Sequence, residues 1–432
     1  MLNIVPTYHL AAIMLSMSIQ SGAIVAALSR AFKVSAPPFF TSRILILIAA
    51  FFLQYLIDNR IVIKYDYSGD VPLPTLAGTF DANWYNSIAE QGYSTSADVT
   101  QQQNYHFFPL FPFLMYVVAK VATLDQIQGQ GGYAITGVII SHLLFFAALM
   151  VLYNLTRAVW HSDTVATRSV WLMSALPWAF VFSMTYTEAL FLLVSLGGAA
   201  VAYRASTQPS LISVVLASLL SVLASLTRPQ GVLVSLLVLA LVAIIPRGLP
   251  LAKRLGYAAL AVIPAAVAVG SFILYTGWRT GNVWAVLQNN RTWGNGWLAD
   301  LPRVLTPPPA NLLWFIDIYA TLGLITWLTL LVLLTVQFIK LRRTKGEIPE
   351  QLTPEASVFW PFLAYSWVYF LFTALNSPSN SSWGRYLMVI FPCVWALAST
   401  GITRVSFRMV IMVCLVLQVL LLAAAVLQQA TP

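Results

Sequence analysis

The chain has 432 residues, of which 59% are hydrophobic and only 9% are charged, and its mean hydropathy is +0.79. Soluble proteins carry about 25% charged residues, so this composition excludes an ordinary soluble enzyme. Because apolar runs of about 20 residues recur from end to end, we predict an all-α polytopic membrane protein. The net charge of +9 does not indicate a nucleic-acid partner, since the basic residues fall in short clusters between the apolar runs.

Twelve apolar segments are candidate spans of a single membrane domain covering residues 1–432, which predicts about 11–12 transmembrane helices. In chain order they are Leu10–Leu28, Ile44–Ile63, Tyr133–Leu155, Val170–Tyr186, Glu188–Tyr203, Leu211–Leu226, Gly231–Ile245, Leu255–Tyr275, Leu312–Ile339, Ser357–Leu375, Tyr386–Thr400 and Met409–Leu427.

The segment His106–Ala122 decides the topology, because counting it as a span would invert every later segment. If it lies on the membrane surface, one side collects fifteen of the 23 Lys and Arg residues, and the positive-inside rule makes that side cytoplasmic. These residues are Arg30, Lys33, Arg43, Arg157, Arg168, Arg204, Arg247, Lys253, Arg254, Lys340, Arg342, Arg343, Lys345, Arg404 and Arg408. The two long loops, residues 64–132 and 276–311, then lie outside the cytoplasm.

Asp81 lies in the first long loop, just beyond a predicted span. An unperturbed Asp has a pKa of about 3.9, so its carboxylate is ionised at neutral pH and suits a general base. Asp is also a favoured helix N-cap, and the spacing alone leaves both interpretations open. Glu90 follows on the same predicted helix, either as a partner acid or as a solvated surface charge.

Three further charged residues lie at the outer ends of predicted spans: Glu188 in TYTEALF, Arg228 in LTRPQG and Arg385 after SSWG. Ionisable groups at a membrane boundary commonly mark functional sites, although snorkelling or a structural ion pair produces the same pattern. A guanidinium there can hold a phosphate, and an interfacial anchor is the alternative. His106 has no His or Cys neighbour at metal-ligand spacing, and no DxD pair lies near Asp81, so we expect no metal or other cofactor.

The chain contains, in order, FDANWYNSIAEQGY, FFPLFP, PWAFVFSMTYTEALF and LTRPQG, followed by QNNRTWG and by Arg385 with Pro392. Together these motifs resemble the PIG-V family (GPI mannosyltransferase 2) and its bacterial relatives over about residues 78–392. The resemblance implies a GT-C glycosyltransferase fold with juxtamembrane helices in the first outer loop. It also implies that Asp81 is the catalytic acid and that the donor is a polyprenyl-phosphate sugar, typically mannose. Phe80 stands where the family usually has Trp, and Asn295 stands where it often has Arg.

We therefore predict an inverting transfer in which Asp81 deprotonates the acceptor hydroxyl, while Arg228 or Arg385 neutralises the departing phosphate. The residues predicted to bind substrate are Trp84, Tyr85, Glu90, His106, Tyr186, Glu188, Gln288 and Trp293. The acceptor is a glycolipid, a glycan or a protein, and a bacterial plasma membrane is favoured over the ER. The alternative functions are transfer of another polyprenyl-phosphate sugar and a multispanning transporter.

Overall fold

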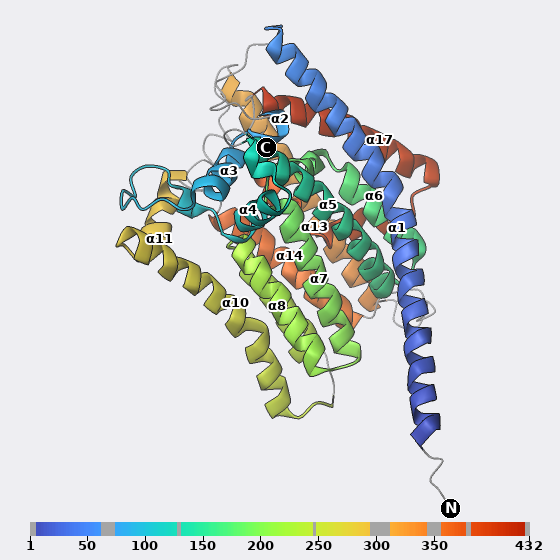
Figure 1. The fold of residues 1–432 in the computed structure, drawn as a ribbon. Coiled ribbons are helices and arrows are strands. Elements are labelled where there is room, and N and C mark those ends of the chain that lie inside the picture. The colour runs from blue at the N-terminus through green and yellow to red at the C-terminus, as the bar shows by residue number, and fades with distance from the viewer. Residues whose placement is uncertain are drawn as a thin grey trace, which may run out of the picture.

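The computed structural model describes residues 6–61, 74–127, 131–244, 248–293, 312–343, 356–376 and 382–427. Over these ranges the ordered elements are helices and none is a strand, which confirms the all-α prediction (Figure 1). The longer helices are α1 (Pro6–Asp58), α3 (Asp81–Gln91), α4 (Leu110–Val121), α5 (Gly131–Trp160), α6 (Asp163–Ala175), α7 (Glu188–Thr207), α8 (Leu211–Thr227), α9 (Gly231–Leu239), α10 (Leu251–Thr280), α13 (Leu312–Arg343), α14 (Ala356–Asn376) and α17 (Arg404–Val426). Short elements are α2 (Pro74–Ala77), η1 (Asn104–His106), η2 (Leu124–Gln126), η3 (Pro177–Ser183), η4 (Ala240–Ile244), α11 (Ala285–Asn289), η5 (Asn290–Trp293), α15 (Trp383–Leu387) and α16 (Cys393–Ala398).

Seven of the described helices are long and apolar enough to cross a membrane, and the number is eight if α6 and η3 form one bent span. This confirms a polytopic membrane protein, although the described residues contain fewer long helices than the 11–12 spans predicted. Three shorter apolar helices, Leu110–Val121, Leu211–Thr227 and Gly231–Ala243, accompany them. The twelve residues of α4 extend about 18 Å, well short of a hydrocarbon core of about 30 Å. A position at the membrane surface, as predicted for His106–Ala122, therefore suits α4.

The prediction that a loop separates the first two spans is wrong. The predicted span Leu10–Leu28 and residues 44–58 of the predicted span Ile44–Ile63 lie on one continuous helix, α1, which runs through Pro37 and Pro38. Residues 62 and 63 lie outside the described residues. The basic residues between the two segments suggested a loop, but Arg43 points into the bundle and is only 2% exposed. It is therefore not a cytoplasmic loop residue.

Arg43 is buried because it donates hydrogen bonds to carbonyl groups at a break in the neighbouring span. The predicted span Val170–Tyr186 bends by 76° between α6 and η3. Pro177 at the start of η3 interrupts the helix, and carbonyl groups freed inside a membrane need other donors. The Arg43 guanidinium donates to the carbonyl oxygens of Ser174 and Ala179, and Gln418 Nε2 also donates to that of Ser174.

The predicted span Tyr386–Thr400 is also not a plain helix. It falls on two short helices, α15 and α16, with Pro392 at the N-cap of α16. A proline disfavours helical geometry in the residue before it, which accounts for the break. The first helix carries Arg385.

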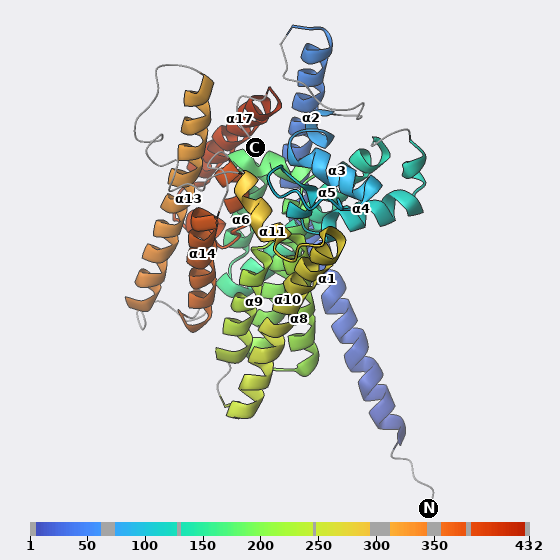
Figure 2. The ribbon, with the colours of Figure 1, turned by 90° about the vertical axis from the view of Figure 1, so that its left-hand side faces the viewer.

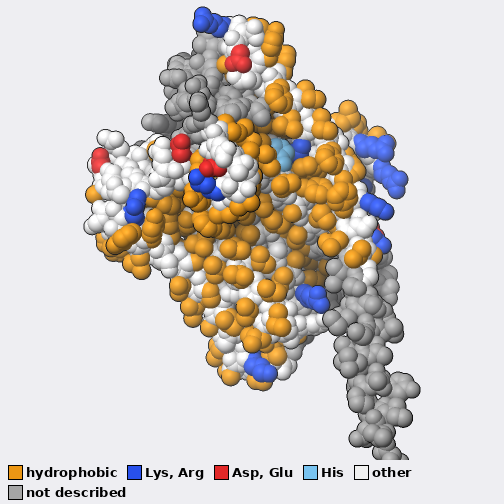
Figure 3. Space-filling view, viewed as in Figure 1, with side chains coloured by type: hydrophobic (Ala, Val, Ile, Leu, Met, Phe, Trp, Pro, Cys, Tyr) orange, Lys and Arg blue, Asp and Glu red, His pale blue; other side chains and the backbone are white. Residues whose placement is uncertain are grey.

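Helices α5, α7 and α8 pack side by side in the middle of the bundle, with α9 against α8. Helix α10 packs against α8 and α9, and Figure 2 shows α13 and α14 on one side of the bundle with the N-terminal part of α1 on the other. In both views the N-terminal part of α1 projects beyond the bundle. In Figure 3 apolar side chains cover most of the described surface on this face, and most of the acidic atoms in view lie in its upper part, around α3 and at the upper end of α1 in Figure 1.

Candidate active site

Four charged side chains from distant parts of the chain meet at one end of the bundle. Asp81 Oδ2 lies 2.6 Å from Arg385 Nη2, and Arg385 Nε lies 3.4 Å from Glu188 Oε1. The same Glu188 oxygen lies 3.1 Å from Arg228 Nη2. The Glu188 and Arg385 side chains are almost fully buried, whereas that of Asp81 is 23% exposed. The sequence singled out all four residues, and the structure joins them into one charge cluster with two acids and two cations.

Asp81 is held by the turn that precedes it. It is the first residue of α3, and Phe80 at the N-cap has φ 48° and ψ −116°, a strained conformation for a non-glycine residue. The Tyr186 hydroxyl donates to the Thr79 carbonyl at 3.1 Å, and Asn86 Nδ2 donates to the Ala77 carbonyl at 2.7 Å. These two bonds hold the strained turn in place. The N-cap residue of α3 is therefore Phe80 and not Asp81, and the Asp81 side chain is directed to Arg385.

Both residues of the Tyr-x-Glu motif contact the Arg385 guanidinium. Arg385 lies between the rings of Tyr186 and Tyr386, with 4.7 Å from its Cζ atom to each ring centroid. Glu188 is the first residue of α7, where the helix dipole favours a negative charge. Tyr186 and Glu188 therefore contact Arg385 by cation–π and ionic interactions respectively. The sequence did not single out Tyr386, and its only signal was adjacency to Arg385.

Two glycines allow the motifs to meet. A Cβ atom on Gly384 would collide with the indole ring of Trp178, from the PWAF motif. A Cβ atom on Gly231 would collide with the backbone of Ala224, across the turn that links α8 and α9. The first contact brings Arg385 next to the segment that carries Glu188. The second closes the LTRPQG turn that presents Arg228.

A cavity of about 270 Å³ opens beside this charge cluster. Arg228 lines it, and Arg228 Nη1 is buried without a hydrogen-bond partner among the described residues. Arg385 is not among the described residues that line it. The lining residues are Asp81, Tyr85, His106, Phe107, Phe108, Thr227, Arg228, Pro229, Gln230, Val269, Ile273, Val286, Leu287, Asn290, Phe372 and Tyr386. The cavity therefore offers a carboxylate and an unpaired cationic donor within one mostly apolar wall.

An aromatic cluster lies over one side of the cavity. The His106 ring stacks on Trp293 with 4.7 Å between centroids, and Trp84 contacts Trp293 edge-on at 5.5 Å. The Phe107 ring contacts the rings of Trp84, His106 and Trp293. Burial lowers the pKa of His106 to about 4, against a small opposing effect of Asp81, so the ring is neutral at physiological pH. Of the predicted substrate-binding residues here, Tyr85 and His106 line the cavity, whereas Trp84 and Trp293 lie behind them.

Asn289 joins the second of the two long loops predicted from the sequence to the first. It is fully buried, and its Nδ2 atom donates to the Gln101 carbonyl at 2.6 Å, while its Oδ1 atom accepts from the Gln103 amide at 3.2 Å. Trp293 Nε1 also donates to Oδ1. The predicted residue Gln288 is exposed and accepts a bond from Asn282 instead. The sequence did not single out Asn289.

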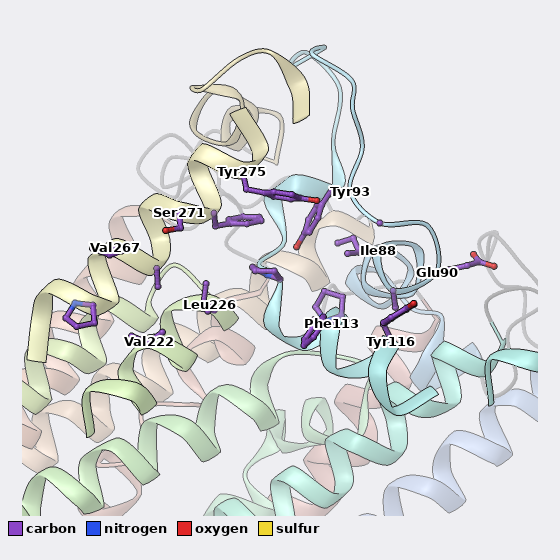
Figure 4. A pocket seen from close by; sticks show the side chains of 17 residues that line it. Ile88, Glu90, Tyr93, Phe113, Tyr116, Val222, Leu226, Val267, Ser271 and Tyr275 are labelled. Carbon is purple, nitrogen blue, oxygen red and sulfur yellow. The ribbon is translucent and has the colours of Figure 1, made fainter. Parts of the chain in front are cut away.

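A second and larger cavity lies next to the first. It is an apolar groove of about 880 Å³ between α3, α4, α8 and α10 (Figure 4). Leu226, Ala268 and Phe272 line the groove, whereas the next residue along the chain in each case lines the Asp81 cavity. Phe108 and Phe272, 4.9 Å apart, are therefore part of a thin wall between the two. Glu90 lines the groove and is not among the residues of the Asp81 cavity.

Among the described residues, no group of three or more His, Cys, Asp or Glu side chains could hold a metal ion. The fold and the charge cluster define a polytopic helical membrane protein with a buried site at one end of its bundle. A family model described as Mannosyltransferase (PIG-V) matches residues 73–245, which confirms the resemblance seen in the motifs. The matched region contains Asp81, Glu188 and Arg228, and it supports a membrane glycosyltransferase. No curated protein matches the chain.

Solved structures overlap with most of the chain at low identity. The oligosaccharyltransferase of Archaeoglobus fulgidus, in complex with Zn and sulfate, is 14% identical with a TM-score of 0.45, covering 89% of this chain and 53% of its own. ArnT from Cupriavidus metallidurans, bound to undecaprenyl phosphate, is 14% identical with a TM-score of 0.47, covering 90% of this chain and 62% of its own. The chain thus spans between half and two thirds of the length of these proteins.

Proposed function

We propose that the chain is a GT-C glycosyltransferase that transfers a mannosyl residue from polyprenyl-phosphate-mannose to an acceptor on the extracytoplasmic side of the membrane. The observation that carries the proposal is the meeting of Asp81 and Arg228 in one cavity, within the region that matches the mannosyltransferase model. One residue supplies a carboxylate base and the other supplies a cation for a phosphate.

Arg228 is the contact for the donor phosphate in this proposal. Its Nη2 atom pairs with Glu188, while its Nη1 atom lacks a partner among the described residues. A buried donor without a partner costs free energy, and an anionic oxygen in the cavity would supply that partner. Because Arg228 then stabilises the charge that develops on the leaving phosphate, the sugar needs no protonating acid.

Asp81 acts as the general base. Its carboxylate removes the proton from the acceptor hydroxyl, the hydroxyl oxygen forms a bond to the anomeric carbon, and the bond from that carbon to the phosphate oxygen breaks. Attack from the face opposite the phosphate inverts the anomeric configuration. Arg385 holds one carboxylate oxygen at 2.6 Å, which leaves the other for the acceptor.

The apolar groove suits the hydrocarbon chain of the donor. It lies directly behind the Phe108–Phe272 wall of the Asp81 cavity. A volume of about 880 Å³ falls in the upper part of the 300–1,000 Å³ range of ligand sites. A prenyl chain in the groove would keep its apolar surface out of water while its phosphate reaches Arg228.

The charge positions favour an enzyme over a transporter. Glu188 begins α7 and Arg228 follows the end of α8, so both lie at helix ends. Transporters usually hold substrate and ions near the middle of the membrane, between internal repeats of the chain. A different polyprenyl-phosphate sugar is the remaining alternative for the same site, and the acceptor is a glycolipid, a glycan or a protein.

The test is transfer of radiolabelled mannose from polyprenyl-phosphate-mannose by purified protein in detergent, with a membrane lipid extract as acceptor. We expect a labelled product from the wild type and none from Asp81→Asn, because the amide cannot accept the proton. Asp98→Asn is the matched control, since Asp98 is an exposed acid of the same loop, and among the described residues its side chain bonds only Thr100. Wild-type activity in Asp81→Asn would remove Asp81 as the base. Transfer from other polyprenyl-phosphate sugars but not from mannose would change the donor.

A further inference from the structure

We propose that Glu188 is a positioning residue that assigns the two arginines to different tasks, with Arg385 on the base and Arg228 on the phosphate. The proposal rests on the function proposed above. The motif alone suggested that Glu188 touches substrate, but the Glu188 side chain is only 1% exposed. It is also not among the described residues that line the Asp81 cavity.

The charge of Glu188 is balanced by the two arginines together. Its Oε1 atom lies 3.1 Å from Arg228 and 3.4 Å from Arg385, and neither carboxylate oxygen makes a directed hydrogen bond within the described part of the chain. An uncompensated carboxylate inside a protein is costly, so both guanidiniums are drawn towards this one atom. Glu188 therefore sets where each arginine lies.

Arg385 is turned towards the base. It lies between the Tyr186 and Tyr386 rings, which fixes the plane of its guanidinium, and its Nη2 atom holds Asp81 Oδ2. Within the described residues nothing bonds Asp81 Oδ1. One oxygen of the base is thus fixed by Arg385 and the other is left for the acceptor hydroxyl.

Arg228 is turned towards the cavity. Its Nη2 atom faces Glu188, its Cζ atom lies 5.1 Å from the Tyr386 ring, and its Nη1 atom has no described partner. Without the Glu188 charge, Asp81 would be the remaining acid of the charge cluster among the described residues. Arg385, released from Glu188, would then close over both Asp81 oxygens and take the one left for the acceptor, while Arg228 would still face the cavity.

The variant Glu188→Gln tests the positioning role of Glu188, because kcat and the affinity for polyprenyl phosphate should respond differently. We expect kcat to fall roughly 10- to 100-fold, the loss that a misplacement of about 1 Å is able to cause. The affinity for polyprenyl phosphate, measured directly without a sugar or an acceptor, should be unchanged or higher, because both cations remain. An affinity that falls in step with kcat would overturn the proposal, and so would an unchanged kcat.

A double variant tests whether Glu188 acts through Arg385. If it does, Glu188→Gln combined with Arg385→Gln should lose little more kcat than the worse of the two single variants. Additive losses would contradict the proposal. Glu188→Asp keeps the charge and serves if the Gln variant does not fold, and we expect it to keep wild-type affinity for polyprenyl phosphate with a partial loss of kcat. Affinity lost together with kcat in Glu188→Asp would equally overturn the proposal.

The two proposals fail in different ways. If the wild type does not bind polyprenyl phosphate, the donor assignment is wrong and the role of Glu188 falls with it. If the wild type binds this lipid and transfers mannose, but Glu188→Gln does so with wild-type kcat, only the role of Glu188 is wrong.

Discussion

Asp81 and Arg385 are separated by 304 positions in the chain, yet their side chains meet at 2.6 Å. Arg385 therefore belongs to the same site as the first outer loop, although α13 and α14 lie between them in the sequence. The contact joins a carboxylate that is partly open to the cavity with a guanidinium that is almost completely buried. A base held from one side by a rigid cation keeps a defined direction towards its substrate.

The two arginines should differ when each is neutralised. We expect Arg228→Gln to raise the donor KM by about 10- to 100-fold, since hydrogen bonds to charged groups contribute about 1.5–3 kcal/mol. Arg385→Gln should instead lower kcat with little change in donor KM, because Arg385 contacts the base. Steady-state kinetics with varied donor separate the two effects. Arg204→Gln, an exposed cation near the end of α7, is the control. Equal increases in donor KM for both site variants would contradict this division.

Donor binding should be sensitive to a larger side chain in the apolar groove. We expect Ser271→Trp, which adds a large ring inside the groove, to raise KM for a long-chain polyprenyl donor more than for a short-chain analogue. The shorter chain needs less of the groove, so its binding should be affected less. Ile263→Trp is a matched control, because Ile263 is exposed on the same helix and is not among the groove residues. Equal effects on both chain lengths would argue against a prenyl chain in the groove.

His106 should make the protein less stable in acid. Its pKa in the folded protein is about 4, below the ordinary value of about 6.5. As the pH falls from 6.5 towards 4, the unfolded chain takes up a proton on His106 before the folded protein does, so folding becomes less favourable. We expect the thermal midpoint of the wild type to fall more between pH 7 and pH 5 than that of His106→Gln. The same fall in both proteins would show that His106 does not contribute.

The contact between Gly384 and Trp178 should tolerate no side chain. Gly384→Ala should lower stability by about 1–3 kcal/mol, since the added Cβ forces the indole ring or the backbone to move. Arg385 follows directly, so we expect activity to fall as well. Gly256→Ala is the control, because a Cβ there meets no atom within 4 Å and Ala is the better helix former. Thermal unfolding in detergent would measure both, and an unaffected Gly384→Ala would contradict the packing argument.

Chelation should not abolish transfer. With Arg228 neutralising the leaving phosphate, the proposed reaction needs no divalent cation. We expect full activity after treatment with EDTA and dialysis. A loss of activity that is restored by added Mg²⁺ or Mn²⁺ would show that a metal takes part in the reaction.

The first outer loop and the charged residues of the site could be recognised in the sequence because their signals are local. Asp81, Glu188 and Arg228 each interrupt an apolar background, and an ionisable group at the end of a span is costly enough to be conspicuous. Asn289 and Tyr386 gave no such signal. An amide and a tyrosine at a membrane surface are ordinary, and their roles depend on partners elsewhere in the chain.

The same reliance on local pattern explains the error in α1. Basic residues within an apolar stretch predicted a loop, because the sequence around Arg43 does not show which carbonyl groups it will meet. Those carbonyls lie at the α6–η3 break, more than a hundred positions away. A buried cation inside a helix is stable only with such partners. Hydrogen bonds between residues so far apart in the chain cannot be predicted from the sequence of one segment.

The sequence by itself determined that this is a helical membrane protein with a long polar loop carrying Asp81, because the lengths of apolar runs and the placement of charges are properties of single segments. The tertiary structure alone decided what each charge does. Burial places Glu188 behind two arginines, the tyrosine rings orient Arg385 towards Asp81, and the turn after α8 leaves Arg228 facing the cavity. Charges in a low-dielectric interior act through their nearest partners, and those partners come from segments that only folding brings together.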